Sequence, residues 1–234
     1  MIIMNGVFNM KYTYVCSDLH GMYDKYIVLV NTLKNSDELY IIGDVINRGN
    51  DGIKILQDII KRDNVHMTLG NHEFLLREDL NQLAGCEKHE INKIISDSLE
   101  IGNIGQLDTL KDFSKLSFKE QYEILDYLAE VSLYAKLNIN SKDYILVHAG
   151  LTDFDGLPIE YLSEDDLLLG HHNYNINHYP NTTVIIGHQP TRFIPGAEPD
   201  KIYHKGDTIN VDCGLGFGGK LGVLCLDTGK ELYF

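Results

Sequence analysis

The sequence predicts a mixed α/β (α+β) domain with parallel strands in its first half and a β-rich second half. Three observations support this prediction: strand-length apolar runs alternate with helical patterns near the start, a mostly helical stretch follows, and glycine turns separate further apolar runs near the end. A chain of 234 residues, 44% of them hydrophobic, can bury one large core. We therefore expect residues 1–234 to form a single domain.

The apolar runs that predict strands each stop at a polar or glycine-containing turn. They cover residues 12–16, 39–43, 65–69, 144–148 and 183–187. Between the first three lie the stretches "YDKYIVLVNTLKN" and "DGIKILQDIIKR", whose apolar residues recur at helical spacing. This alternation indicates a β-α-β-α-β start in which neighbouring strands run parallel.

A long stretch over residues 74–131 follows the third predicted strand and is mostly helical in pattern. Within it, Ser117 and Glu120 form a capping-box signature, in which each side chain satisfies a free backbone N–H at the start of a helix. We interpret this stretch as a helical insertion. Because it follows a strand end, we expect it to border any site that forms there.

Apolar runs return after the insertion. The stretch "LYAKLNINSKDYILVHAG" predicts two strands joined by a turn at 139–143, and the segment from "INVDCGLGFGG" onward predicts further short strands with glycine turns. Residues 171–182, "HHNYNINHYPNT", show no clear period. They predict an ordered loop, either a solvated surface loop or a rim that faces a substrate.

Charge and hydropathy limit the classes of partner. A formal net charge of −14 weighs against binding of a nucleic-acid backbone, which needs clustered Lys and Arg. Small anions remain candidates, because bound cations can reverse the local field. No apolar run approaches the roughly 20 residues that cross a bilayer, and the start "MIIMNGVFNM" has no basic region before its hydrophobic residues. We therefore expect a soluble, cytoplasmic protein without a membrane partner.

The four cysteines favour the same reducing compartment. Cys16, Cys86, Cys213 and Cys225 are widely spaced and form no CxxC pair. We expect buried free thiols rather than disulfides or a thiolate metal site.

Polar side chains that can bind metal ions follow five of the predicted strands. They occur in the motifs "SDLHG", "GDVINRG", "GNHE", "HAG" and "GHQP", and the six donors are Asp18, His20, Asp44, Asn71, His148 and His188. Because binding groups collect where the strands of a mostly parallel sheet end, these donors are expected to converge. Carboxylate and amide oxygens mixed with imidazoles suit Mn, Fe or Zn. A carboxylate such as Asp44 can bridge two cations, so the sequence predicts two divalent metal ions.

Each donor has a simpler interpretation when it is taken alone. A single histidine is more often a satisfied core or surface side chain, and Asp18 or Asp44 could instead cap the helix that follows it. Five short motifs in fixed order, each after an apolar strand, favour the metal site.

The ordered set DxH, GDxxxRG, GNHE, HAG and GH resembles the signature of the calcineurin-like metallophosphoesterases, in their phosphoprotein phosphatase (serine/threonine phosphatase) branch of bacterial type. The resemblance extends from Asp18 to "DCGLGFGGKL". It implies a sandwich of two β-sheets flanked by helices. It also implies that one metal ion is held by Asp18, His20 and Asp44, and the other by Asp44, Asn71, His148 and His188.

The same resemblance implies the catalytic roles. A water or hydroxide between the two metals, most simply Mn ions, would attack phosphorus in line. Arg48, and with it Asn71, would contact the phosphoryl oxygens. His72 would protonate the leaving oxygen, and Glu73 is expected to have a structural role.

Two positions depart from the usual family pattern. The motif usually reads GDxVDRG, whose second aspartate orients the catalytic histidine and stabilises its charged form; Asn47 occupies that place here. A second arginine often follows a "DLLW"-like stretch, and "DDLLLGHHNY" offers His171 there instead. Arg192, after "GHQPT", is a candidate substitute as a phosphate-binding residue, although a solvent-facing arginine is the simpler interpretation.

Three functions are compatible with these residues. The leading prediction is a metal-dependent phosphomonoesterase that acts on phosphoserine or phosphothreonine in proteins or on small phosphate esters, and the motif GNHE favours it. The second is a dinucleoside polyphosphate hydrolase of the diadenosine tetraphosphate type. Those relatives also lack the aspartate at the place of Asn47, but they usually show GNHD. The third is a non-catalytic, metal-binding interaction protein.

Overall fold

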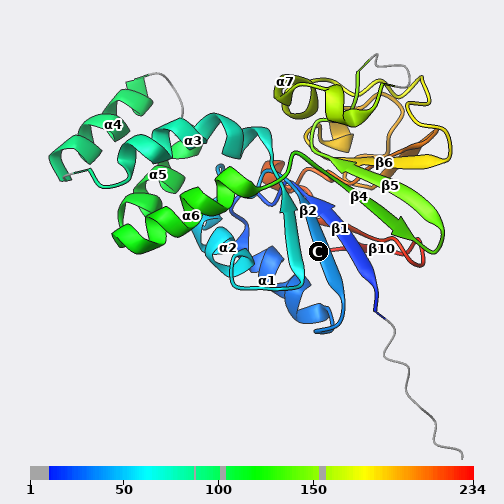
Figure 1. The fold of residues 1–234 in the computed structure, drawn as a ribbon, viewed down its shortest axis with the longest axis horizontal. Helices are drawn as coiled ribbons and strands as arrows, with labels where there is room; N and C mark the ends of the chain where they lie inside the picture. Colours follow the sequence, from blue (N-terminus) through cyan, green and yellow to red (C-terminus); the bar gives the residue numbers. More distant parts are fainter. Residues whose placement is uncertain (1–10, 87, 101–103, 153–156) are drawn as a thin grey trace, which may run out of the picture.

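Two five-stranded β-sheets packed face to face form the centre of the molecule (Figure 1). The computed structural model describes residues 11–86, 88–100, 104–152 and 157–234. The first sheet has the strand order β10-β9-β1-β2-β3. Its strands are β1 (Thr13–Ser17), β2 (Glu38–Ile42), β3 (Val65–Thr68), β9 (Gly222–Cys225) and β10 (Glu231–Tyr233). Because β1, β2 and β3 run parallel, the predicted β-α-β-α-β start is confirmed.

The second sheet has the strand order β4-β5-β6-β8-β7. Its strands are β4 (Tyr134–Ile139), β5 (Lys142–Val147), β6 (Thr182–Ile186), β7 (Tyr203–Lys205) and β8 (Thr208–Asn210). The predicted turn between β4 and β5 consists of Asn140 and Ser141, whose φ angles of 51° and 62° are left-handed, as a two-residue hairpin turn requires. β5, β6 and β8 run parallel, so the carboxyl ends of β5 and β6 lie at one edge.

Three apolar clusters hold these layers together. Helices α1 (Tyr23–Thr32) and α2 (Gly52–Ile59) cover the outer face of the first sheet, and a second cluster lies between the two sheets. Neighbouring residues of β2 serve both clusters, since Ile41 packs under the helices and Ile42 packs between the sheets. This is the two-sided burial expected of a central parallel strand. The third cluster lies under α7 (Glu164–Leu168), against the second sheet.

The helical segment between β3 and β4 projects to one side of the sheets (Figure 1). It consists of α3 (Asn71–Leu83), α4 (Lys88–Glu100), α5 (Leu107–Ser114) and α6 (Phe118–Glu130). The predicted capping box is present, because Glu120 accepts a hydrogen bond from the Ser117 N–H at 2.9 Å. The predicted start at residue 74 is wrong, because the helix already begins at Asn71. Gly70 precedes it in an extended conformation and donates its N–H to Glu73 at 3.1 Å.

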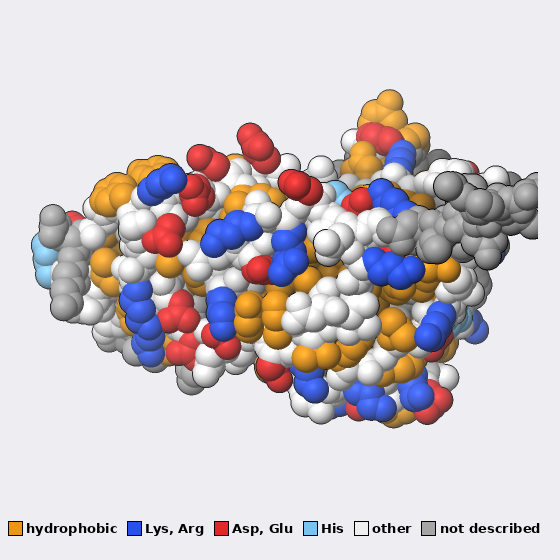
Figure 2. Space-filling model, turned by 90° about the horizontal axis from the view of Figure 1, so that it is seen from below, with side chains coloured by type: hydrophobic (Ala, Val, Ile, Leu, Met, Phe, Trp, Pro, Cys, Tyr) orange, Lys and Arg blue, Asp and Glu red, His pale blue; other side chains and the backbone are white. Residues whose placement is uncertain are grey.

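Charged and hydrophobic side chains are mixed on the face of the molecule drawn in Figure 2. There, lysine and arginine side chains are spread among acidic and hydrophobic ones. Among the described residues, no helix is both long enough and apolar enough to cross a bilayer. All four cysteines are free; Cys86 is partly exposed and the other three are buried.

Candidate active site

The six predicted metal ligands converge where strands of both sheets end. Asp18 and His20 follow β1, Asp44 follows β2, and Asn71 follows β3 as the first residue of α3. His148 follows β5 and His188 follows β6. The two sheets therefore bring residues from distant parts of the sequence to one place, as the motifs predicted. The alternative that the aspartates cap helices is wrong, because α1 and α2 are preceded by Met22 and Asp51.

The backbone at four of these ligands is left-handed. The φ angles are 52° for Asp18, 44° for His20, 54° for Asp44 and 67° for His188. A non-glycine residue in this region costs on the order of 1–3 kcal/mol and persists only where its surroundings fix it. Neighbouring loops supply that fixation, since the His20 N–H donates to the Asp44 carbonyl at 2.9 Å. Strain stored at a cluster of polar side chains is typical of a functional site.

Glycines let the ligand loops approach each other closely. A Cβ atom on Gly70 would lie 2.2 Å from the Asp44 nitrogen and 2.3 Å from its Oδ1. A Cβ atom on Gly187 would lie 2.4 Å from Asp18 Oδ2. Any side chain at either position would therefore displace a ligand carboxylate.

The first group of ligands surrounds the Nε2 atom of His20. This atom lies 3.8 Å from Asp18 Oδ1 and 3.8 Å from Asp44 Oδ2. The other ring nitrogen, Nδ1, is 3.1 Å from the Ile46 carbonyl and donates its hydrogen there. That bond leaves the Nε2 lone pair directed at the carboxylates, which is the orientation a metal ligand needs.

The second group lies on the opposite oxygen of Asp44. Asp44 Oδ1 is 3.4 Å from His148 Nε2. Asn71 Oδ1 is 2.8 Å from that nitrogen and 2.9 Å from His188 Nδ1. His148 donates from Nδ1 to the Ile42 carbonyl at 3.0 Å, so its Nε2 faces the group.

This donor set fits two cations that share Asp44. The facing nitrogens of His148 and His188 are 3.2 Å apart, with the Asn71 oxygen within hydrogen-bond distance of both. Three lone pairs so close together need a proton or a cation between them. Asp44 offers one oxygen to each group, which is the arrangement of a bridging carboxylate.

The charges of the cluster favour a bound cation. Burial lowers the pKa of His20 to about 4. Burial also disfavours the charged form of His148, but Asp44 and Asp18 outweigh it and raise the pKa of His148 to about 10. Burial opposes ionisation of Asp44, yet the neighbouring His148 and His72 hold its pKa well below the ordinary range. The ionised carboxylate therefore attracts positive charge to this point, which a metal ion would supply.

Glu73 holds the loop that carries Asp44. Its carboxylate is fully buried and accepts hydrogen bonds from four backbone N–H groups, those of Asp44, Val45, Ile46 and Gly70, at 2.8–3.1 Å. Burial and the charge of Asp44 raise its pKa to about 7, and the backbone hydrogen bonds oppose that shift. The final residue of the GNHE motif thus acts on the backbone, as its predicted structural role requires.

His72 stands beside the first group with Asn47 as its partner. Its Nε2 is 3.8 Å from Asp44 Oδ2, and its Nδ1 is 2.9 Å from Asn47 Nδ2. Burial lowers the pKa of His72; Asp44 opposes this shift, and the charge of Arg48 adds to it. In this arrangement the Asn47 amide donates to Nδ1, and the His72 proton resides on Nε2, facing the ligands. The Asn47 Oδ1 is buried without a hydrogen-bond partner among the described residues.

The helical segment fixes the loop that carries Asn47 and Arg48. The N–H of Asn47 donates to Thr109 Oγ1 at 3.1 Å, and the N–H of Arg48 donates to the Gly105 carbonyl at 2.8 Å. Both residues are left-handed, with φ angles of 66° and 67°. The insertion therefore borders the site, as predicted.

The predicted phosphate-binding residues lie in three different settings. Arg48 is exposed at the mouth of the cluster. His171 is also exposed and lines a small pocket together with His188. Arg192 is engaged in the protein, since it donates from Nε to Asp200 at 2.7 Å and from Nη1 to the Phe217 carbonyl at 2.9 Å.

One acidic residue near the ligands was missed in the sequence. Asp212 is buried, and its Oδ1 accepts a hydrogen bond from the Gly214 N–H at 2.9 Å. Burial and then the nearby Asp18 raise its pKa well above the ordinary value. A signal was available, because Asp212 directly follows "INV", the start of a segment predicted to form short strands, as the predicted ligands follow their strands.

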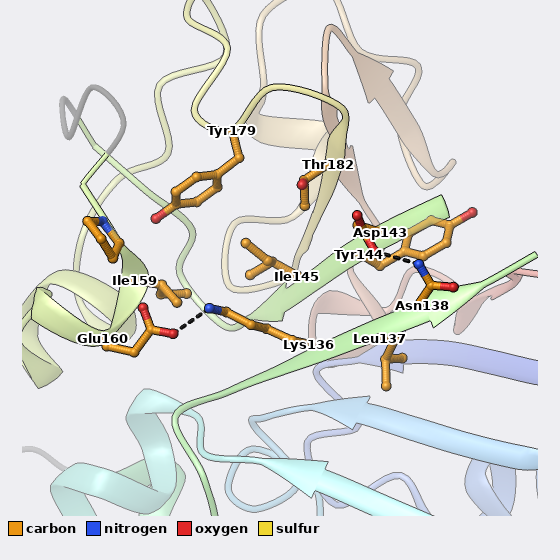
Figure 3. A pocket seen from close by; sticks show the side chains of 11 residues that line it. Lys136, Leu137, Asn138, Asp143, Tyr144, Ile145, Ile159, Glu160, Tyr179 and Thr182 are labelled. Carbon is orange, nitrogen blue, oxygen red and sulfur yellow. Dashed lines mark hydrogen bonds and ion pairs between the residues drawn. The ribbon is translucent and has the colours of Figure 1, made fainter. Parts of the chain in front are cut away.

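A pocket of about 500 Å³ lies elsewhere, over β4, β5 and the start of β6. Figure 3 shows Lys136 and Tyr179 among the side chains around it, with Lys136 paired to Glu160. Its lining includes none of the predicted site residues. The ligand cluster is the better candidate for an active site, because metal donors, an arginine and a partly buried histidine converge there.

The sequence of the chain matches a known protein family. The family model described as calcineurin-like phosphoesterase matches residues 12–221. The chain belongs to the calcineurin-like phosphoesterase family. The matched range includes both ligand groups, and the family's two-metal chemistry agrees with the shared carboxylate of Asp44.

Curated relatives of this phosphoesterase carry one name. A protein of Nitrosospira multiformis is 29% identical over 142 residues, which are 59% of this chain and 43% of that protein. A protein of Nitrosomonas europaea is 31% identical over 145 residues, which are 59% of this chain and 44% of that protein. Both are named symmetrical bis(5'-nucleosyl)-tetraphosphatase. The match spans less than half the length of these relatives.

Solved structures confirm the predicted sandwich with its flanking helices. A crystal structure described as a candidate diadenosine tetraphosphatase has a TM-score of 0.63 at 19% identity, and the match covers 95% of this phosphoesterase and 92% of that chain. A protein serine/threonine phosphatase of Saccharomyces cerevisiae has a TM-score of 0.59 at 15% identity, with 96% and 75% covered. At such identities the likeness establishes the fold alone.

Proposed function

We propose that this phosphoesterase hydrolyses dinucleoside polyphosphates, with a water molecule attacking a phosphorus of the chain and a nucleoside phosphate leaving. The single observation that carries the proposal is the pair of Asn47 and His72, joined at 2.9 Å. This replaces our leading prediction of a serine/threonine phosphatase by the alternative. The names of the curated relatives support the same choice.

The partner of His72 matters because it sets how strongly that histidine donates a proton. An aspartate in place of Asn47 would stabilise the charged imidazolium, whereas the asparagine amide supplies no charge. In the serine proteases, the comparable change from aspartate to asparagine costs about 10⁴ in turnover. A serine or threonine alkoxide leaves badly without a proton, but a nucleoside diphosphate is a good leaving group. The site is therefore better suited to phosphoanhydrides than to alkyl esters.

The other residues of the site have roles in the same reaction. Arg48 presents a guanidinium at the exposed mouth, where its planar fork can hold two phosphoryl oxygens. Asn71, His171 and Arg192 remain predicted substrate contacts, and Arg192 would first have to share its bond to Asp200. Two divalent ions, which we propose to be Mn, with Fe and Zn as alternatives, would lower the pKa of the attacking water and neutralise phosphate charge.

A protein phosphatase remains the second candidate, because His72 is retained beside Asp44. A proton on its Nε2 could still assist a poor leaving group. Phosphopeptides therefore belong in the decisive experiment.

The experiment is a panel of substrates assayed with Mn²⁺ and, as a control, with a chelator. It includes diadenosine tetraphosphate, phosphoserine and phosphothreonine peptides, and p-nitrophenyl phosphate. We expect kcat/KM for the dinucleotide to exceed that for the peptides by about 10²-fold or more, the kind of margin that differential transition-state binding provides. A preference for the peptides would contradict the proposal in favour of the second candidate. If no substrate shows metal-dependent turnover, the non-catalytic interpretation prevails.

A further inference from the structure

Two exposed phenylalanines lie together at the mouth of the site. Phe193 belongs to the short helix η3 (Thr191–Phe193) and Phe217 to η4 (Leu215–Phe217). Their rings meet edge to face with centroids 5.6 Å apart. Their exposed fractions are 56% and 45%, so both rings remain open to solvent. We name these two residues the aromatic platform.

The platform is attached to the phosphate-binding side of the site. The guanidinium carbon of Arg48 lies 4.1 Å from the centroid of the Phe217 ring. A Cβ atom on the preceding Gly216 would lie 2.4 Å from the His20 ring and 3.0 Å from Arg48 Cδ. The loop that carries Phe217 therefore rests directly on a metal ligand and on the predicted phosphate clamp.

The platform is also held in place. Arg192 neighbours Phe193 in the chain and donates to the Phe217 carbonyl, so it links the two short helices. Asp200 pairs with the same guanidinium at 2.6 Å. The two rings are thus presented by a braced backbone, and presenting them is a role for Arg192 that the sequence did not reveal.

We propose that the aromatic platform stacks one nucleobase of the substrate while Arg48 holds the phosphates attached to it. This inference rests on the proposed function and names the part of the substrate that the exposed rings recognise. A base is linked to its phosphates through one ribose, so a ring in contact with the phosphate clamp lies within its reach. Stacking of a base on an aromatic side chain contributes about 1–3 kcal/mol and tolerates every base.

A competing role for Phe217 is to position Arg48 by the cation–π contact alone. The two roles differ in what they predict for ligands without a base. If Phe217 only positions Arg48, its loss weakens every phosphate ligand alike. If the platform stacks a base, its loss weakens nucleotides and spares inorganic phosphates.

The test is a titration of the Mn-loaded protein with ADP and with inorganic pyrophosphate, for the unchanged chain and for Phe217→Ala. We expect the substitution to weaken ADP about tenfold, as the loss of one stacked base implies, and pyrophosphate less than twofold. Phe217→Tyr, which keeps the ring, should restore ADP binding. The matched control is Phe118→Ala, which removes another exposed phenylalanine, 59% accessible against 45% for Phe217, from the start of α6.

Equal weakening of ADP and pyrophosphate binding, or no weakening of ADP binding, would contradict the proposed stacking role of the aromatic platform. The proposed function fails by a different result, namely the absence of diadenosine tetraphosphate cleavage by the unchanged chain. If ADP binding depends on Phe217 in a chain that does not cleave the dinucleotide, the platform stands and the proposed function falls.

Discussion

The buried ligand cluster and the exposed rim of the site follow different rules. Asp18, Asp44 and His148 are each at most 2% exposed, and their rings and carboxylates are fixed by backbone hydrogen bonds. Arg48 and Phe217 at the rim are exposed and contact each other. The cluster contains the predicted metal ligands, whereas the rim faces solvent, from which a substrate arrives. The comparison teaches that the residues that would hold the metal ions are buried and fixed, whereas Arg48 and Phe217, which would contact the substrate, are exposed.

The largest effect is expected from a change in the buried cluster. Asp44→Asn removes the charge that both ligand groups share, and we expect kcat/KM to fall by about 10³-fold or more for every substrate, at least the loss seen when one preorganised polar group is removed. Bound metal, measured by elemental analysis, should fall with it. Asp24→Asn, an exposed carboxylate in the first turn of α1, is the control. Full activity of Asp44→Asn would remove the bridging role.

A change at the rim should have a smaller effect than a change in the buried cluster. Arg48→Ala removes the phosphate clamp, and we expect kcat/KM to fall by about 10²-fold while metal content stays unchanged. Steady-state kinetics and elemental analysis on the same sample distinguish a loss of activity at the rim from a loss of metal in the cluster. Loss of metal from this variant would show that the rim and the cluster are not independent.

The close approach of the loops can be tested without changing any ligand. Gly70→Ala places a Cβ atom against the backbone and carboxylate of Asp44, and we expect a loss of about 1–3 kcal/mol in the free energy of unfolding, measured with urea. Metal affinity should fall as well, because the carboxylate must move. Gly105→Ala meets nothing within 4 Å and serves as the control. Equal stability of both variants would contradict the crowding at Gly70.

The smallest effect concerns the partner of His72. Asn47→Asp should raise turnover of alkyl phosphates by about tenfold more than turnover of aryl phosphates, because only the poor leaving group needs a strong proton donor. Parallel assays of phosphoserine peptides and p-nitrophenyl phosphate give this ratio. The same relative change for both substrates would leave Asn47 without a role in leaving-group protonation.

Much of the buried cluster could be predicted from the sequence, because its residues follow apolar strands directly. Asp18, Asp44 and His148 each stand within one or two residues of a strand end, where the pattern of hydrophobic residues is clearest. The capping box at Ser117 was visible for a similar reason, since its two members are three residues apart. Local spacing therefore determined what could be predicted.

The rest depends on contacts between distant residues, which spacing does not encode. The left-handed backbone of Asp44 lies in a loop whose N–H groups donate to Glu73, and the residue types in the sequence do not predict these hydrogen bonds. Arg192 pairs with Asp200 and braces Phe217, although its place after a histidine motif favoured a phosphate or solvent role. The contact between Phe217 and Arg48 could not be predicted, because Phe217 lies in a glycine-rich segment far from Arg48 in the sequence and only the fold brings them together.

The hydrogen bond from the His188 N–H to Asp18 joins residues 170 positions apart, and this separation has a consequence for synthesis. A ribosome that adds about 5–20 residues per second needs roughly 9–34 seconds to proceed from Asp18 to His188. Asp18, His20 and Asp44 are made at the start of this interval, whereas His148 is made late in it and His188 at its end. The full set of predicted ligands is therefore available only once the residues up to His188 have been made, and a chain that ends before them would lack part of the site.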